Sequence, residues 1–220
     1  MREFVFLSDR TRDRFLRIVS PLGNLLARLG VHPNVISLAG LALSLVAGLV
    51  YSTGSFFFGA WVVALAGTCD VLDGLLARQT EKVSLFGAFF DSTLDRFGET
   101  SVFLGLAWHF SGGGAFFGSG AGVQSPLTVL FIVLAAAGSF MVSYTRARAE
   151  GLGVDCRVGW MQRPERITLL IIGSLLGAIP GVGSFLMSLT LLLLAVFSNI
   201  TALHRIVHVK NMLAKGIEIQ

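Results

Sequence analysis

The sequence predicts an all-α integral membrane protein in which six transmembrane helices follow an N-terminal amphipathic interfacial helix. The first observation is composition: the 220 residues are 54% hydrophobic and only 14% charged, whereas soluble domains carry about a quarter charged residues. The second is that Asp, Glu, Lys and Arg are absent from 31–69, 101–145 and 167–203. Apolar stretches of about 20 residues without charge are typical of membrane spans.

Residues 1–30 are predicted to form the juxtamembrane amphipathic helix. Apolar residues recur there at helical spacing with arginines between them, a pattern that suits the surface of an anionic membrane leaflet. The segment lacks the continuous apolar core of a signal peptide. The apolar positions are Phe15, Leu16, Val19, Leu22, Leu25, Leu26 and Leu29.

The six predicted spans account for residues 31–206, followed by a cytoplasmic tail over 207–220, and the whole chain 1–220 is predicted to be a single domain. The fifth span is the least apolar, because only 167–179 is strongly hydrophobic. It reaches a usable length if its helix begins near Pro164, since proline suits the first helical turn. The predicted spans are 34–52, 56–77, 84–110, 126–148, 164–179 and 184–205.

The basic residues predict the orientation. None of the 17 Lys and Arg residues lies in the connections at 52–54, 111–122 or 180–183, so with six spans all of them fall on one side. The positive-inside rule then places both termini and the active site on the cytoplasmic side of the cell (inner) membrane. The net charge of +4 indicates lipid head groups and phosphorylated substrates rather than nucleic acid, and Cys69 and Cys156 are expected to be free thiols.

Four aspartates lie close to the apolar runs. Asp70 and Asp73 are three residues apart, and Asp91 and Asp95 four apart, so each pair projects from one face of a helix. The short connection 79–84 makes the two helices neighbours, and the carboxylates can meet. Four carboxylates in a low-dielectric site need cations, and an oxygen-only ligand set indicates one or two Mg²⁺ or Mn²⁺ ions, with Ca²⁺ less favoured.

Small residues lie at regular offsets between these aspartates. Gly74, Ala77 and Gly87 either let a ligand approach the backbone or let membrane helices pack tightly. Together with Arg78 the stretch reads D-x2-D-G-x2-A-R-x8-G-x3-D-x3-D, from Asp70 to Asp95. This pattern resembles the signature of the CDP-alcohol phosphotransferases at every position.

The resemblance implies a membrane-embedded homodimer that transfers a phosphatidyl or similar group from CDP-diacylglycerol, or a similar CDP-lipid, to an alcohol and releases CMP. It implies that the four aspartates hold the metal and that Asp95 is the general base. The spacing alone does not identify the base, and metal binding alone is the other interpretation of Asp95. The residues implied in CDP-lipid binding are Asp73, Gly74, Ala77, Arg78 and Gly87.

The acceptor is predicted from a second basic cluster. The stretches SYTRARAE at 143–150 and QRPERI at 162–167 resemble the phosphatidylinositol-phosphate synthase branch of the family, whose acceptor is inositol 1-phosphate. The positive-inside rule explains some of these arginines, but arginine also suits bidentate binding of a phosphate. In that branch Lys is frequent at position 146 and Glu at 162, where this chain has Arg and Gln. The candidate contacts to the acceptor phosphate are Arg146, Arg148, Arg163, Arg166 and Arg205.

Two alternatives to this function stay open. The same reaction could use glycerol 3-phosphate or another alcohol, although the Gly-Lys-x-Lys-Thr run of the glycerophosphate branch is absent. A non-enzymatic alternative is a divalent-metal transporter that uses the aspartates as its ion site. A transporter requires polar residues through the whole membrane depth, whereas the outer halves of the predicted spans are uncharged.

Two further polar residues carry weaker predictions. Asn34 is expected to cap the first span and is also a candidate contact to the nucleotide. Glu99 lies one turn beyond Asp95, where it could support the site or a dimer contact. By default, a carboxyl group at such a position is expected to be neutral and hydrogen-bonded.

Overall fold

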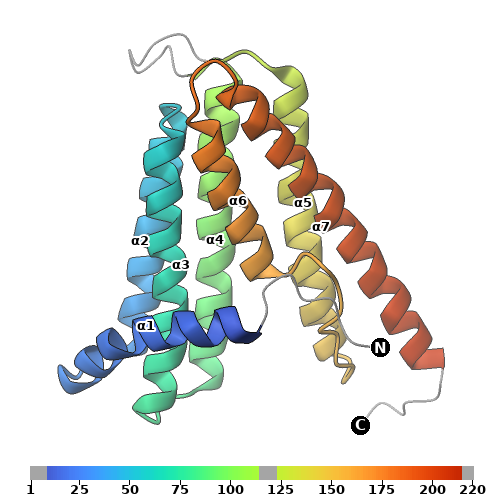
Figure 1. Ribbon diagram of the computed structural model, residues 1–220. Coiled ribbons are helices and arrows are strands. Elements are labelled where there is room, and N and C mark those ends of the chain that lie inside the picture. The colour runs from blue at the N-terminus through green and yellow to red at the C-terminus, as the bar shows by residue number, and fades with distance from the viewer. Residues whose placement is uncertain (1–8, 114–122, 215–220) are drawn as a thin grey trace.

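The computed structural model describes residues 9–113 and 123–214, and this part of the chain is helical, with no β-strand. Residues 1–8 of the predicted N-terminal helix and 215–220 of the predicted tail lie outside it. Within the described ranges the helices are α1 Asp9–Arg28, α2 Pro33–Ser52, α3 Phe56–Gln79, α4 Leu85–Phe110, α5 Pro126–Glu150, α6 Arg163–Gly177 and α7 Gly183–Ala214 (Figure 1).

A helix forms at each of the six predicted spans. The four helices α2, α3, α5 and α7 are long and apolar enough to cross a membrane, which confirms an all-α integral membrane protein. α4 has 26 residues but carries the aspartates. α6 has 15 residues and is therefore about 22 Å long at 1.5 Å per residue, against a hydrocarbon core of about 30 Å. The count of six spans stays a prediction.

Local side-chain chemistry explains where several helices begin. The Ser84 hydroxyl accepts a hydrogen bond from the Gly87 amide at 3.0 Å and caps α4. Pro164 lies in the first turn of α6, as predicted. The expectation that Asn34 caps the first span is wrong, because the helix begins at Pro33 and the imidazole of His32 accepts from the Asn34 amide at 3.3 Å.

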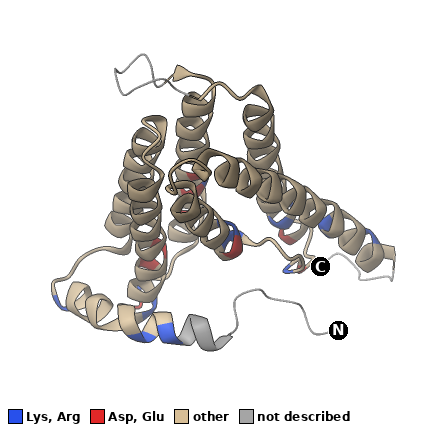
Figure 2. Ribbon diagram, turned by 45° about the horizontal axis from the view of Figure 1, so that its top comes forward, with Lys and Arg blue, Asp and Glu red and all other residues tan. Residues whose placement is uncertain are grey.

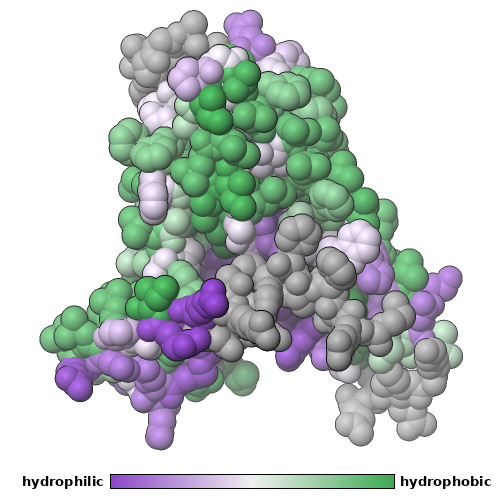
Figure 3. Space-filling view, viewed as in Figure 1, coloured by the Kyte–Doolittle hydropathy of each residue, from purple (hydrophilic) through white to green (hydrophobic). Residues whose placement is uncertain are grey.

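The helices form two groups that spread apart toward one end. α2, α3 and α4 lie together, α5 packs along α7, and α6 lies between the groups against α3 and α7 (Figure 1). The apolar core occupies the opposite end, where Tyr51, Phe110 and Met187 are fully buried. Charged residues of the described helices gather toward the spread end (Figure 2), and the sides above it are mostly apolar (Figure 3).

Helix α1 crosses this charged end, roughly perpendicular to the bundle (Figure 1). It contacts α3 at Gly23, which lies against Leu75, and through the Gln79 amide, which donates to Asn24 Oδ1 at 2.9 Å. Other apolar residues of α1, including Ile18 and Leu25, are exposed. Their exposure is consistent with the predicted position of α1 at a membrane surface.

Helices α2 and α4 approach closely because both carry glycine at their contact. A Cβ atom added at Gly105 would overlap the backbone carbonyl of Gly48, and one added at Gly48 would overlap the carbonyl of Ser101. Backbone atoms cannot move aside as the end of a flexible side chain can. Small residues at this contact therefore determine the spacing of the two helices.

We expect Gly105→Ala to lower the free energy of unfolding by about 2 kcal/mol, because overpacking displaces backbone atoms. The measurement is denaturant unfolding in detergent micelles. Gly67→Ala is the matched control, since its new Cβ would make an ordinary contact of 3.6 Å with Ile167. Equal stability of the two variants would contradict this account of the α2–α4 contact.

Candidate active site

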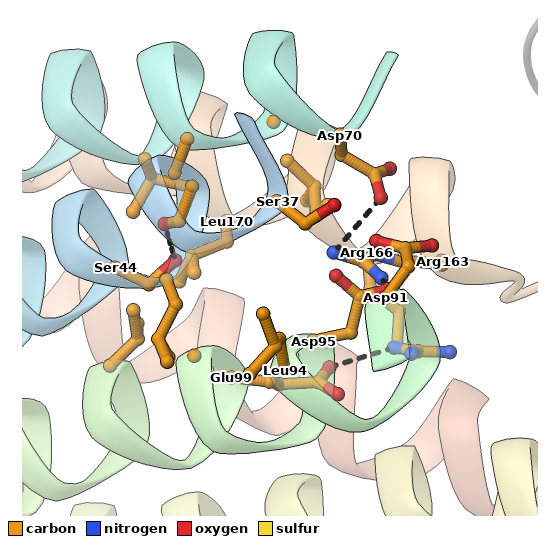
Figure 4. Close-up of a pocket in the computed structure, with 18 of the residues that line it drawn as sticks. Ser37, Ser44, Asp70, Asp91, Leu94, Asp95, Glu99, Arg163, Arg166 and Leu170 are labelled. Atoms are coloured by element: carbon orange, nitrogen blue, oxygen red, sulfur yellow. Dashed lines mark hydrogen bonds and ion pairs between the residues drawn. The ribbon is translucent and has the colours of Figure 1, made fainter. Parts of the chain in front are cut away.

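A cavity lies between α2, α3, α4 and α6 at the charged end of the bundle (Figure 4). It encloses about 800 Å³ of empty space, counting the part that opens to solvent. Its walls are largely apolar, with Gly40, Leu41 and Gly67 among them. The acidic and basic residues that line it are Asp70, Asp73, Asp91, Asp95, Glu99, Arg163 and Arg166.

Three of the four predicted metal ligands meet at one point of this cavity. Carboxylate oxygens of Asp70 on α3 and of Asp91 and Asp95 on α4 lie within 4.8 Å of one another. Asp73 lines the same cavity but is only 5% exposed, and its Oδ2 accepts a hydrogen bond from the Ser37 hydroxyl at 2.6 Å. The short connection between α3 and α4 therefore brings the two aspartate pairs together, as predicted.

Ser37 is a residue of the site that the sequence analysis missed. It lies on α2 and fixes the orientation of the Asp73 carboxylate from the neighbouring helix. Its hydroxyl also lies 3.4 Å from the carbonyl oxygen of Pro33. The hydroxyl of a serine in a membrane helix commonly donates to a carbonyl of its own helix. The sequence near Ser37 therefore does not single it out, and only the packing of α2 on α3 brings it to Asp73.

A guanidinium group lies against the carboxylate cluster. Arg163, at the start of α6, forms ion pairs with Asp95 and, at 3.6 Å, with Asp70. The cluster thus already holds a cation between two of the oxygens that could bind a metal. Three carboxylates with no nitrogen or sulfur donor, arranged around a positive group, fit a hard divalent ion such as Mg²⁺ or Mn²⁺.

The residues predicted to bind the CDP-lipid lie around the charged ends of α2, α3 and α4. A Cβ added at Gly74 would lie 3.6 Å from the Arg78 guanidinium, and one added at Gly87 would lie 3.7 Å from Asn34 Oδ1. Ala77 is half-buried on α3. Gly74 therefore leaves backbone open beside a polar side chain, whereas a Cβ at Gly87 would crowd the capping Ser84 hydroxyl at 3.0 Å. The role of both glycines in nucleotide binding stays a prediction.

The five arginines predicted to bind the acceptor phosphate divide into two sets. Arg163 and Arg166 line the cavity. Arg146 pairs with Glu150 at 2.8 Å and Arg148 is exposed, both on α5. Arg205 on α7 is 2% exposed.

The Arg205 guanidinium contacts backbone carbonyls. Its Nε donates to Val158 at 2.8 Å and its Nη1 donates to Val142. It thereby connects α7 to α5 and to the loop 151–162. In this conformation Arg205 holds the loop that leads to Arg163.

Other residues of α7 hold the same loop. The Thr201 hydroxyl accepts from the Met161 amide at 3.1 Å. Gly159 has φ +116, and a Cβ there would overlap the Thr201 methyl group, so the loop requires glycine at this point. These contacts determine where α6 begins and hence where its arginines lie.

The predicted tail also packs against the loop 151–162. α7 continues as a helix to Ala214, so residue 206 is not a structural boundary. Val209 and Met212 pack against Val154 and Cys156 of the loop. Burial raises the pKa of the Cys156 thiol above its ordinary value, although the nearby Arg205 opposes the shift, so this free cysteine stays protonated at neutral pH.

Sequence comparison decides the family of this chain. Residues 30–202 match the profile of the CDP-alcohol phosphatidyltransferases. The chain belongs to this family. The match covers all the residues of the aspartate pattern, the cavity and the arginines that line it.

Curated relatives of this transferase include two that differ in their lipid. It is 34% identical over 217 residues to the phosphatidylinositol phosphate synthase of Streptomyces avermitilis, covering 96% of this chain and 85% of that protein. It is 34% identical over 201 residues to the archaetidylinositol phosphate synthase of Methanothermobacter thermautotrophicus, covering 91% and 93%.

Solved structures of similar fold include the phosphatidylinositol phosphate synthase PgsA1 of Mycobacterium tuberculosis. Its complex with CDP-DAG superposes with a TM-score of 0.77 at 32% identity, covering 88% of this transferase and 94% of that chain. Its complex with manganese and citrate gives a TM-score of 0.76 at 32% identity, covering 87% and 88%.

We expect Arg163→Ala to tighten Mn²⁺ binding by the transferase about tenfold, because the guanidinium competes with the ion for Asp70 and Asp95 and a tenfold change corresponds to about 1.4 kcal/mol. The affinity is measured directly, from free Mn²⁺ by electron paramagnetic resonance. Arg157→Ala, which breaks an exposed pair with Asp155, should leave the affinity unchanged. Unchanged or weaker binding in Arg163→Ala would contradict the competition.

Proposed function

We propose that this transferase moves the phosphatidyl group of CDP-diacylglycerol, or of a similar CDP-lipid, to inositol 1-phosphate and forms phosphatidylinositol phosphate and CMP. The observation that carries the proposal is the position of Arg163 and Arg166 in the cavity that holds the aspartates. Guanidinium groups beside the reaction site suit an acceptor with a phosphate of its own, whereas a plain polyol needs no such pair. The names of the relatives and of the solved structures support the same acceptor.

Asp95 is proposed as the general base. The acceptor hydroxyl oxygen attacks the lipid-bearing phosphorus, the bond from that phosphorus to the bridging oxygen breaks, and CMP leaves with the bridging oxygen. The hydroxyl proton passes to the Asp95 carboxylate. Asp95 suits this role because it lines the cavity beside Arg163, so the base lies next to a group that can hold the acceptor's phosphate.

Asp70, Asp91 and Asp95 are proposed to hold one Mg²⁺ or Mn²⁺ ion, and Asp73, oriented by Ser37, could complete the set or hold a second. When bound, the metal neutralises charge on the pyrophosphate and on the departing CMP. Gly74, Ala77, Arg78, Gly87, Asn34 and Asp73 are proposed to surround the CDP group.

We further infer the membrane arrangement. α2 to α7 would form six spans of one domain, with α1 on the cytoplasmic surface and both termini and the cavity on the cytoplasmic side of the cell membrane. The charge distribution supports this orientation, because the charged residues of the described helices lie toward the cavity end (Figure 2). The homodimer implied by the family resemblance stays a prediction.

The proposed acceptor is tested with a panel of alcohols. Purified protein with CDP-diacylglycerol and Mn²⁺ should release CMP with inositol 1-phosphate at least tenfold faster than with glycerol 3-phosphate, inositol or serine. Faster release of CMP with glycerol 3-phosphate would identify that alcohol as the acceptor, and the type of reaction would be unchanged. No CMP with any acceptor, together with Mn²⁺ flux in liposomes, would favour the transporter instead.

We expect Asp95→Asn to lower turnover at least a hundredfold, because an amide cannot accept the acceptor's proton, and general bases contribute about 10²–10⁴-fold. CDP-lipid binding, measured separately with a labelled lipid, should stay within about threefold of wild type. Turnover close to wild type would remove Asp95 from the role of base. Loss of CDP-lipid binding would assign it to the donor site.

A further inference from the structure

Glu99 contacts two arginines at once and belongs to neither the metal cluster nor the nucleotide site. Its Oε2 accepts from Arg96 Nη1 at 2.8 Å, and its Oε1 accepts from Arg166 Nε at 3.1 Å. Arg96 lies on the same helix, α4, whereas Arg166 lies on α6. Both carboxylate oxygens thus accept from guanidinium groups, so Glu99 bridges α4 and α6.

This bridge is the second of two acid–arginine pairs that cross the cavity between α4 and α6. The first is Asp95 with Arg163, one turn nearer the start of both helices. The first pair includes a metal ligand and is partly open, since the Arg163 side chain is 27% exposed. The second is deeper, with the Arg166 side chain 4% exposed. The deeper pair is therefore more shielded from solvent than the first.

One nitrogen of the Arg166 guanidinium has no partner among the described residues. Its Nε bonds to Glu99 and its Nη1 to the Met161 carbonyl at 3.3 Å, but its Nη2 is buried and has no hydrogen-bond partner in the described part of the chain. A buried guanidinium donor without a partner is unfavourable. Arg166 is also one of the residues that line the cavity.

Glu99 lies between two guanidinium groups. Its one carboxylate faces both Arg96 and Arg166, and the other carboxylate whose charge acts on Arg166 is that of Glu165. Arg96 is also held by α5, since its Nη1 lies 2.6 Å from the Ser143 hydroxyl. The carboxylate thus lies between Arg166 and a second, anchored cation, and it keeps the two guanidinium groups from repelling each other.

We propose that Glu99 is a positioning residue for the phosphate of the acceptor. By holding Arg166 through Nε and balancing Arg96, it keeps the free Nη2 of Arg166 in place for a phosphate oxygen in the cavity. This inference rests on the proposed function, because it requires an acceptor that carries a phosphate. Glu99, which lies outside the aspartate pattern, would then orient the arginine that binds the phosphate, Arg166.

The test compares steady-state kinetics of wild type, Glu99→Gln and Glu99→Asp with CDP-diacylglycerol, Mn²⁺ and inositol 1-phosphate. An amide cannot balance both guanidinium groups, so KM for inositol 1-phosphate should rise about tenfold in Glu99→Gln, as for loss of one charge-assisted hydrogen bond. The kcat value and KM for CDP-diacylglycerol should stay within about threefold of wild type. Glu99→Asp, which keeps the charge but is one methylene shorter, should show a smaller rise in KM.

A double-mutant cycle tests whether Glu99 acts through Arg166. Arg166→Ala should raise KM for inositol 1-phosphate by itself, and adding Glu99→Gln should raise it no further. Asp155→Asn, which breaks the exposed pair with Arg157, is the matched control and should keep wild-type kinetics. Melting temperature and size-exclusion elution verify that each variant is folded. If Glu99→Gln does not fold, the kinetic comparison is made between Glu99→Asp and wild type.

An unchanged KM for inositol 1-phosphate in a folded Glu99 variant would overturn the inference while leaving the proposed function intact. A fall in kcat with no change in either KM would also overturn the inference. Additive effects of the Glu99 and Arg166 substitutions on KM would overturn it as well. If the wild type uses glycerol 3-phosphate, the same kinetic tests are made with that acceptor, because glycerol 3-phosphate and inositol 1-phosphate both carry a phosphate. A wild type that uses only unphosphorylated alcohols would overturn both the inference and the proposed acceptor.

Discussion

Five carboxylates line a cavity whose walls are otherwise largely apolar, and charge in such surroundings needs compensation nearby. The structure supplies a partner for four of them. Arg163 pairs with Asp95 and Asp70, Arg166 pairs with Glu99, and Ser37 donates to Asp73. The position of α6, the glycine contact between α2 and α4, and the loop before α6 all serve to bring these partners to the carboxylates.

The acidic and the basic residues of the cavity depend on different parts of the chain. The carboxylates come from α3 and α4, which are joined by a short connection and are therefore placed locally. The arginines come from α6, whose start depends on the loop 151–162 and on α7, through Thr201 and Arg205. The carboxylate cluster is thus built by one hairpin, whereas the proposed acceptor site requires long-range packing.

Helix positions and the aspartate cluster could be predicted because their signals are local. Uncharged apolar runs, Pro164 in a first turn and the i, i+3 and i, i+4 spacings of the aspartates all act within one or two helical turns. The arginines could not be assigned in this way. Arg163, Arg146 and Arg205 all lie at or beside the end of a predicted span, yet one lines the cavity, one pairs with Glu150 on α5, and one is buried against backbone carbonyls.

By itself, the sequence determined the helical class, the membrane-spanning character and the chemistry of the carboxylates, because hydrophobicity and helical periodicity are properties of contiguous residues. Only the tertiary structure decided which hydrogen-bonding partners the carboxylates have. The Ser37–Asp73 bond joins residues 36 positions apart, and the Glu99–Arg166 bond joins residues 67 apart. Such pairs depend on how helices pack against one another, and nothing in the residues near either partner specifies that packing.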